Sequence, residues 1–211
     1  MPNWVETTLE ITGPQDELDR FASMVKVEEV EDKWLTKRTG EKHTRLEMNI
    51  IESFLPCPEE LYEVTSPVRE EQKELAQQMM EKYGATDWYT WQHQNWGVKW
   101  GDSSTEIDDS RTTGLFYRYQ TPWGTADVAF TKISAMFPEL RFHFFYDEEA
   151  GFFVGCQVIK NGEIVFDEMF SPASDYNEEV DWDNEDSESQ IKYENWKNDN
   201  ILRIERNAYS V

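Results

Sequence analysis

Residues 126–137 constrain the fold more than any other segment, because they combine the clearest helical periodicity in the chain with strand-like segments on both sides. Apolar residues recur there at the three- and four-residue spacing of an amphipathic helix. Thr125 is placed to cap this helix, and Phe137-Pro138 ends it. The apolar face is predicted to contain Ala126, Ala129, Phe130, Ile133, Met136 and Phe137.

Strand patterns precede and follow this helix. Alternating residues predict a strand at residues 115–119, and three more strands are predicted after residue 140. Asn161-Gly162 is a strong signal for a two-residue hairpin turn between the last two strands. The order strand, helix, strand, strand, strand predicts an α+β fold with an antiparallel or mixed sheet covered by helices on one face. The later strands are expected at residues 141–146, 152–159 and 163–170.

The first hundred residues have weaker α+β signals. Residues 5–11 alternate as a strand with one buried face, and residues 18–25 follow at helical spacing. Ser66-Pro67 is a helix-start signal and Gly84 a stop signal, so a helix is predicted over residues 67–83. A further strand is expected at residues 46–50, a charged, irregular hairpin or loop at residues 28–40, and a polar loop at residues 101–111.

The charge of the chain excludes several classes of partner. Its 43 acidic residues exceed its 20 basic residues, and the formal net charge is −23. Affinity for phosphate backbones comes largely from Lys and Arg, so no direct nucleic-acid binding is expected. The expected partner is a basic face of another protein. The alternative is that the acidity only keeps the chain soluble. No membrane association is expected, because anionic lipids repel such a surface and no apolar run approaches the length of a span.

A change of composition near residue 172 predicts two parts: an α+β domain over residues 1–172 and an acidic extension over residues 173–211. An acidic run is normally solvated. Aromatic residues interleave with this one, however, so part of it is expected to fold back on the domain or to dock on a partner. The predicted partner-binding residues are Asp175, Glu178, Glu179, Asp181, Trp182, Asp183, Glu185, Asp186 and Glu188.

The spacing of these acids limits how closely they imitate DNA. An extended chain rises about 3.3 Å per residue, so eight acids in fourteen residues give one charge per roughly 6 Å. Duplex DNA has one charge per about 1.7 Å of axis. If extended, Asp181, Asp183 and Glu185 would lie on one face about 7 Å apart. A full mimic would also need acids of the folded domain, such as Glu28, Glu29, Glu31 and Asp32.

The sequence contains no recognisable catalytic motif. The three histidines are far apart and lie in no zinc-binding spacing. Nucleophile elbows, phosphate-binding loops and dinucleotide fingerprints are missing. Cys57 and Cys156 have no plausible adjacent base and form no paired motif, which is typical of a reducing cytosol. No metal, cofactor or catalytic residue is therefore predicted, and the absence of a signal peptide agrees with a cytoplasmic protein.

The Trp-rich stretch, residues 88–100, leaves two interpretations open. Its four tryptophans could pack in the core, or they could form an exposed aromatic platform for a peptide or a base. A platform for bases normally has several basic neighbours, and here Lys99 is alone. An enzyme with an unfamiliar site near this stretch, using His93 or Asp102, is a further alternative.

Several motifs over residues 1–170 resemble the Api92-like family, which has a ferredoxin-like domain and occurs in phages and plasmids. The resemblance implies a ferredoxin-like α+β fold, a mobile-element origin and hence the cytoplasm of a bacterial host, but no activity and no iron–sulfur cluster. The similar motifs are Asn3-Trp4, Thr12-Gly13-Pro14, Trp88-Tyr89, Asn95-Trp96-Gly97-Val98-Lys99-Trp100, Trp123-Gly124, Phe137-Pro138 and Gly151.

Charge, missing motifs and this resemblance together predict a non-enzymatic phage or mobile-element protein that binds a basic protein surface. The concrete hypothesis is an anti-defence inhibitor that occupies the nucleic-acid groove of a host nuclease or defence complex. A structural module of a phage assembly is the remaining alternative.

Overall fold

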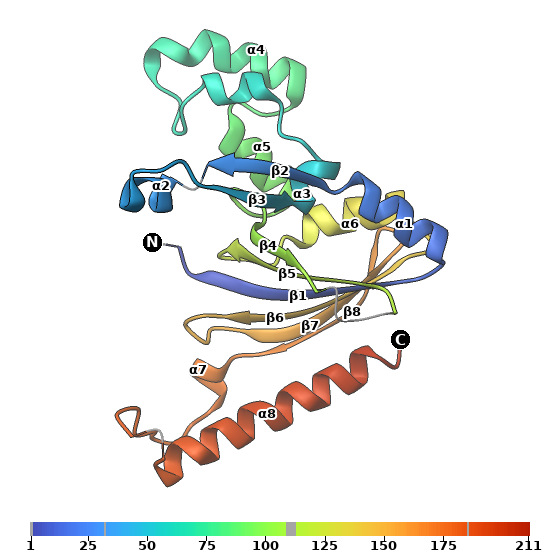
Figure 1. The fold of residues 1–211 in the computed structure, drawn as a ribbon, viewed down its shortest axis with the longest axis vertical. Helices are drawn as coiled ribbons and strands as arrows, with labels where there is room; N and C mark the ends of the chain where they lie inside the picture. The colour runs from blue at the N-terminus through green and yellow to red at the C-terminus, as the bar shows by residue number, and fades with distance from the viewer. Residues whose placement is uncertain (1, 32, 109–112, 185) are drawn as a thin grey trace.

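The computed structural model describes residues 2–31, 33–108, 113–184 and 186–211. Its centre is a six-stranded sheet in the order β4-β5-β1-β6-β7-β8, in which every neighbouring pair is antiparallel (Figure 1). The strands are β1 (Trp4–Thr12), β4 (Ser103–Ile107), β5 (Leu115–Pro122), β6 (Arg141–Glu148), β7 (Val154–Lys160) and β8 (Glu163–Phe170).

A split β-α-β unit lies at the middle of this sheet. β1 runs antiparallel to both β5 and β6, so β5 and β6 are parallel to each other with β1 between them. Helix α6 (Asp127–Met136) connects the two parallel strands. This connectivity is the core of a ferredoxin-like arrangement, and it confirms the predicted α+β fold and the predicted strands on either side of the helix.

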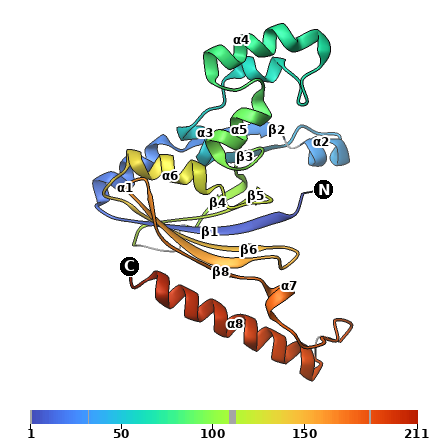
Figure 2. The same ribbon diagram turned by 180° about the vertical axis from the view of Figure 1, so that it is seen from behind.

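Four helices lie on one face of the sheet, and the main core is formed by apolar side chains of these helices, of the strands and of the segments near them (Figures 1 and 2). Phe21 is at its centre, with its ring 4.8 Å from that of Phe54 and 5.2 Å from that of Phe137. Aromatic rings in such stacked and edge-on pairs stabilise a core beyond the area they bury. The four helices are α1 (Gln15–Met24), α3 (Ile50–Phe54), α5 (Trp88–Trp96) and α6.

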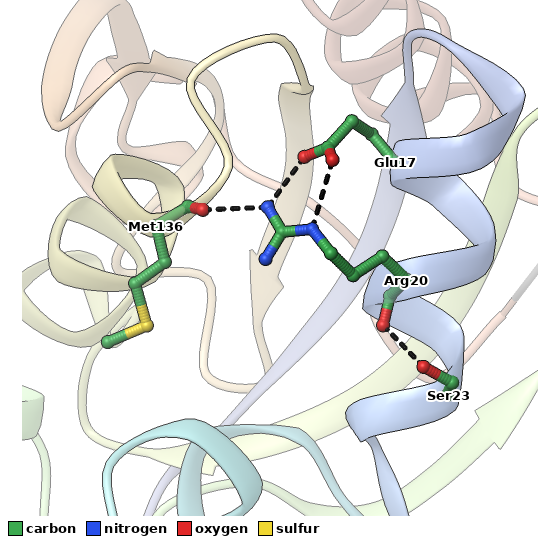
Figure 3. A network of polar contacts seen from close by, with 4 residues as sticks. All are labelled: Glu17, Arg20, Ser23 and Met136. Atoms are coloured by element: carbon green, nitrogen blue, oxygen red, sulfur yellow. Dashed lines mark hydrogen bonds and ion pairs between the residues drawn. The ribbon is translucent and has the colours of Figure 1, made fainter.

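The predicted apolar face of α6 is mostly confirmed, with two errors at its ends. Met136 is 42% exposed, whereas the other five predicted residues are buried. Thr125 does not cap the helix, because Ala126 adopts a left-handed conformation there and the Asp127 carboxylate accepts the N–H of Val128 instead. Figure 3 shows how the far end of α6 is held: Arg20 of α1 donates to the carboxylate of Glu17 and to the carbonyl oxygen of Met136.

Helix α8 (Glu188–Ala208) covers the opposite face of the sheet (Figure 2). The expectation of helices on one face only is therefore wrong. The reason is strand β7, whose residues are buried on both sides, so that alternate apolar residues need a second cover. The second core contains Val154, Cys156, Val158, Phe170, Ile204 and Ala208.

Between α1 and β4 the chain forms an additional layer above the helices. Residues 28–40 were expected to form an irregular hairpin or loop, but most of the described ones belong to strand β2 and helix α2. Strand β4 lies within the expected loop 101–111, of which residues 109–111 are outside the described residues. The layer contains β2 (Lys26–Glu31), α2 (Lys33–Thr39), β3 (Thr44–Asn49), the short 3-10 helices η1 (Glu59–Glu63) and η2 (Glu70–Gln72), and α4 (Lys73–Tyr83).

The predicted helix 67–83 begins six residues late, at Lys73 of α4. The side chain of Gln72 accepts hydrogen bonds from the N–H and hydroxyl of Thr65 and donates to the carbonyl of Glu63. These bonds hold the preceding residues in a loop. The predicted end is confirmed, because Gly84 has the left-handed conformation (φ +71°) of a helix stop.

The C-terminal end of α8 is fixed to the sheet by polar contacts. Arg141 donates to the carbonyl oxygen of Ala208 at 2.7 Å, and the hydroxyl of Tyr209 donates to Glu10 at 2.7 Å. The ring of Tyr209 covers His143, with centroids 4.5 Å apart. His143 is only 4% exposed, so its ring is shielded from solvent.

His143 is expected to make stability depend on pH. Burial, and secondarily the charge of Arg141, lowers the pKa of His143 below its ordinary value of 6.5, and Glu10 opposes the shift. The unfolded chain therefore binds this proton at a higher pH than the folded chain, so stability falls as pH drops below 6.5 and levels off below the folded pKa. Urea unfolding should show wild type losing stability relative to His143→Gln between about pH 7.5 and pH 5.5. A constant difference would contradict this assignment.

No helix among the residues described is both long and apolar enough to cross a membrane.

Candidate functional site

The acidic segment between β8 and α8 folds back on α8 through aromatic side chains. It begins with the short helix α7 (Pro172–Asp175). The ring of Tyr176 lies 5.1 Å from that of Trp196, and the ring of Trp182 lies 5.1 Å from that of Tyr193. These contacts explain why aromatic residues interleave with the acids: they attach the segment to the helix while the carboxylates remain in solvent.

The backbone of the segment turns after Asp181, so Asp181 and Asp183 do not lie in the extended arrangement that was considered for them. The carboxylate of Asp181 accepts the N–H of Asp183 at 3.2 Å, and the N–H of Asp181 donates to Ser189 at 3.0 Å. Such a local carboxylate–backbone bond replaces extended structure by a turn. Glu185, and Asp32 of the acids proposed to complete a DNA mimic, lie outside the described residues.

The other predicted site residues lie around this turn. Asp175 caps its own short helix by accepting the N–H of Ser171, and Glu178 forms an ion pair with Lys192 at 2.7 Å. Glu188 is in the first turn of α8, where a negative charge interacts favourably with the helix dipole. All the predicted site residues that the structure describes are exposed: Asp175, Glu178, Glu179, Asp181, Trp182, Asp183, Asp186 and Glu188.

Sequence reasoning missed the acids that the sheet brings to the same place. Glu6 of β1 and Asp147 of β6 are direct cross-strand partners, so their side chains point to the same face. Glu148 and Glu149 follow at the end of β6. These acids line a hollow of about 430 Å³ together with Trp182 of the acidic segment and Tyr193 and Lys197 of α8. Only the strand register reveals this meeting, because Glu6 is 141 residues from Asp147 in the sequence.

Two further hollows adjoin Trp182. One is lined by the β6–β7 turn together with Tyr176 and Glu178, and the other by Glu179, Asp181 and Asp183. Trp182 is 63% exposed and lines all three. Among the described residues that line them, Lys197 has the only positive charge, and its Nζ lies 2.8 Å from Asp147. We call this region the Trp182 surface: Glu6, Asp147, Glu148, Glu149, Glu179, Asp181, Trp182, Asp183 and Tyr193.

Not every acid considered for a DNA mimic reaches this surface. Glu28, Glu29 and Glu31 lie on β2, on the opposite side of the main sheet from α8 (Figure 1). The described acids therefore do not form one continuous face.

The Trp-rich stretch divides between both interpretations. Trp96 is buried, and its indole N–H donates to the carbonyl oxygen of Leu55 at 2.9 Å. Trp100 is 49% exposed and lies 6.0 Å from exposed Trp123, with the Lys99 ammonium 3.9 Å from the Trp100 ring. Core packing is therefore correct for Trp96, whereas Trp100 is a surface residue.

The two groups named for an enzymatic alternative each make contacts with other residues. Asp102 is buried and binds the start of α3, whereas the ring of His93 packs 4.4 Å from that of Tyr89. Burial raises the pKa of Cys57 to about 11 and that of Cys156 to about 12, so both thiols are protonated at neutral pH. No group of three or more described His, Cys, Asp and Glu side chains is placed to hold a metal ion.

Comparisons with known proteins found a similar solved structure and a matching family model. The crystal structure of a protein api92 from Yersinia pseudotuberculosis is similar at 12% sequence identity and a TM-score of 0.43, over 81% of this chain and 99% of that chain. No curated protein matches the sequence. Residues 95–199 match the family model described as the ferredoxin-like domain in Api92-like protein, a range that includes the acidic segment and the first part of α8. Over residues 95–199 this chain is similar to the ferredoxin-like domain of Api92-like proteins.

Proposed function

We propose that this protein acts by binding, without catalysis, and that the Trp182 surface docks on a basic face of another protein. The observation that carries the proposal is the meeting of Glu6 and Asp147 across the sheet beside an exposed tryptophan. Like charges directly opposite each other destabilise a sheet. A partner that supplies positive charge would relieve this repulsion, and exposed tryptophans are frequent energetic anchors of interfaces.

The partner we propose is a nucleic-acid-binding protein of a bacterial host, such as a nuclease or a defence complex. A groove built for phosphates presents Lys and Arg, and carboxylates satisfy the same groups. The resemblance to proteins of phages and plasmids motivates the further proposal that the chain comes from a mobile element and inhibits such a complex. Charge attraction of this kind acts over roughly 10 Å at 0.1 M salt, so it also accelerates association.

Neutralising exposed acids of the Trp182 surface should weaken binding of a lysine- and arginine-rich peptide. The variant Glu179→Gln, Asp183→Asn, Asp186→Asn removes three charges at or next to this surface. We expect about a tenfold loss of affinity at low salt, since each exposed charge pair contributes up to about 1 kcal/mol. Fluorescence anisotropy of the labelled peptide at several salt concentrations measures it.

The matched control is Glu71→Gln, Glu74→Gln, Glu139→Gln, which removes the same charge from exposed positions on other elements. It should weaken binding only slightly. If the two triple variants behave alike, net charge alone attracts the peptide and the Trp182 surface is not the site. Binding that ignores salt would contradict the electrostatic mechanism itself.

A further inference from the structure

We propose that the hollow beside Trp182 is a socket for one arginine side chain of the partner, with its guanidinium between the Trp182 ring and the carboxylates of Glu6 and Asp147. This inference rests on the proposed function and names the chemical group that the site selects. The hollow of about 430 Å³ is large enough for such a side chain.

The carboxylates around the hollow exceed the cations available to them. Lys197 forms an ion pair with Asp147. Glu6 accepts a hydrogen bond from the neutral amide of Gln120 and, in the part of the chain that is described, pairs with no lysine or arginine. Glu149 is held at the rim because its Oε1 accepts the N–H of Trp4 at 2.9 Å. The hollow thus has room and negative charge for a second cation.

Glu148 provides independent support. It lines the hollow but is only 2% exposed, and its Oε2 accepts the N–H groups of Ala150 and Phe152 at 3.0 and 2.9 Å. Its buried Oε1 has no hydrogen-bond partner among the described residues. A buried carboxylate oxygen without a partner is costly, and a nearby positive charge reduces that cost.

The aromatic rings of Trp182 and Tyr193, which line the hollow, favour arginine over the other cations that carboxylates attract. The rings of Trp182 and Tyr193 meet at 76°, which leaves the mostly exposed Trp182 beside the acids. A planar guanidinium stacks on an indole and donates in a fork to carboxylates, whereas an ammonium is a compact, strongly hydrated charge. A metal ion would need at least three converging ligands, and the described His, Cys, Asp and Glu side chains form no such group.

The test uses the whole chain and three small probes: the N-acetyl amides of arginine, lysine and citrulline. Citrulline has nearly the shape of arginine but no charge. The indole N–H resonance of Trp182, assigned by its loss in Trp182→Phe, should shift with the arginine probe. It should shift several-fold more weakly with the lysine probe and not with the citrulline probe. Equal responses to all three, or to arginine and lysine, would overturn the assignment.

Two variants and a control locate the socket. Glu6→Gln keeps the acceptor for Gln120 but removes the charge. It should lower the affinity for the arginine probe about tenfold, as expected for loss of a charge-assisted hydrogen bond. Trp182→Ala should lower the affinity for the arginine probe about threefold. Because this variant lacks the indole, the shifts of neighbouring backbone amide resonances measure the binding. The control Glu139→Gln changes an exposed acid in the turn between α6 and β6, and it should leave binding of the arginine probe unchanged. Thermal unfolding confirms that each variant is folded.

The outcomes separate this inference from the proposed function. Suppose that the basic peptide binds and that the triple variant weakens this binding, but that the arginine probe does not shift the Trp182 indole resonance. The socket is then refuted and the binding surface stands. If neither ligand binds, both proposals fail. If folded Glu6→Gln binds the arginine probe as wild type does, the socket is also refuted.

Discussion

Replacing Trp96 with alanine will destabilise the protein by about 3–5 kcal/mol, the range for truncation of a fully buried aromatic side chain. Trp96 belongs to the main core and packs edge-on against Trp91, with centroids 5.8 Å apart. The substitution leaves a large cavity and also removes the hydrogen bond to the carbonyl oxygen of Leu55. Equilibrium unfolding in urea, monitored by circular dichroism, measures the loss.

Trp123→Ala is the matched control, because it removes the same side chain from a position that is 52% exposed. It should cost about 1 kcal/mol or less. Similar losses in the two variants would mean that Trp96 is not a core residue, and the placement of α5 against the sheet would then be wrong.

Asp102→Ala is expected to cost about 3 kcal/mol, because it leaves buried donors without an acceptor. The carboxylate accepts the N–H groups of Ile50 and Ile51, each at 2.8 Å, and the hydroxyl of Thr105 at 2.6 Å. The two isoleucines are buried, and each unsatisfied buried group costs about 1–3 kcal/mol. Asp102 thereby fixes the start of α3, and with it the additional layer, to the edge of the main sheet.

Hydrogen exchange tests this role locally. In Asp102→Ala the amides of Ile50 and Ile51 should exchange much faster. The exchange rates of amides in the distant strand β7 should change only as much as the loss of global stability requires. Asp102→Asn retains one acceptor oxygen and should lose about half as much stability. The control Asp199→Ala changes an exposed acid on α8 and should stay within about 0.5 kcal/mol of wild type. Unchanged exchange at α3 in the alanine variant would contradict this account.

Local patterns predicted the strands of the central sheet other than β4, because burial acts on each of those strands separately. β1 alternates buried Val5, Leu9 and Ile11 with more exposed residues, as its period-two pattern predicted. The Asn161-Gly162 turn is confirmed, with φ values of +47° and +79°. A side chain at Gly162 would also come within 3.2 Å of Ala135 on α6, so the turn needs glycine for two reasons.

Local patterns failed where an element is stabilised by its neighbours. β2 is exposed along most of its length, so its sequence has no buried face to produce a period. Its pairing with β3 makes it a strand. The late start of α4 has a similar cause. The hydrogen bonds of the Gln72 side chain to Thr65 and Glu63, and not the helix propensity of the local sequence, determine where the loop before α4 ends.

The sequence by itself determined the composition of the candidate site: a surplus of carboxylates, aromatic residues among them and no catalytic motif. Those properties belong to residues and need no fold. Only the tertiary structure decided which acids meet, because the register of β1 against β6 places Glu6 opposite Asp147, and the packing of α8 brings Trp182 and Lys197 to them. Such contacts depend on distances between residues remote in the chain, and no local period encodes them.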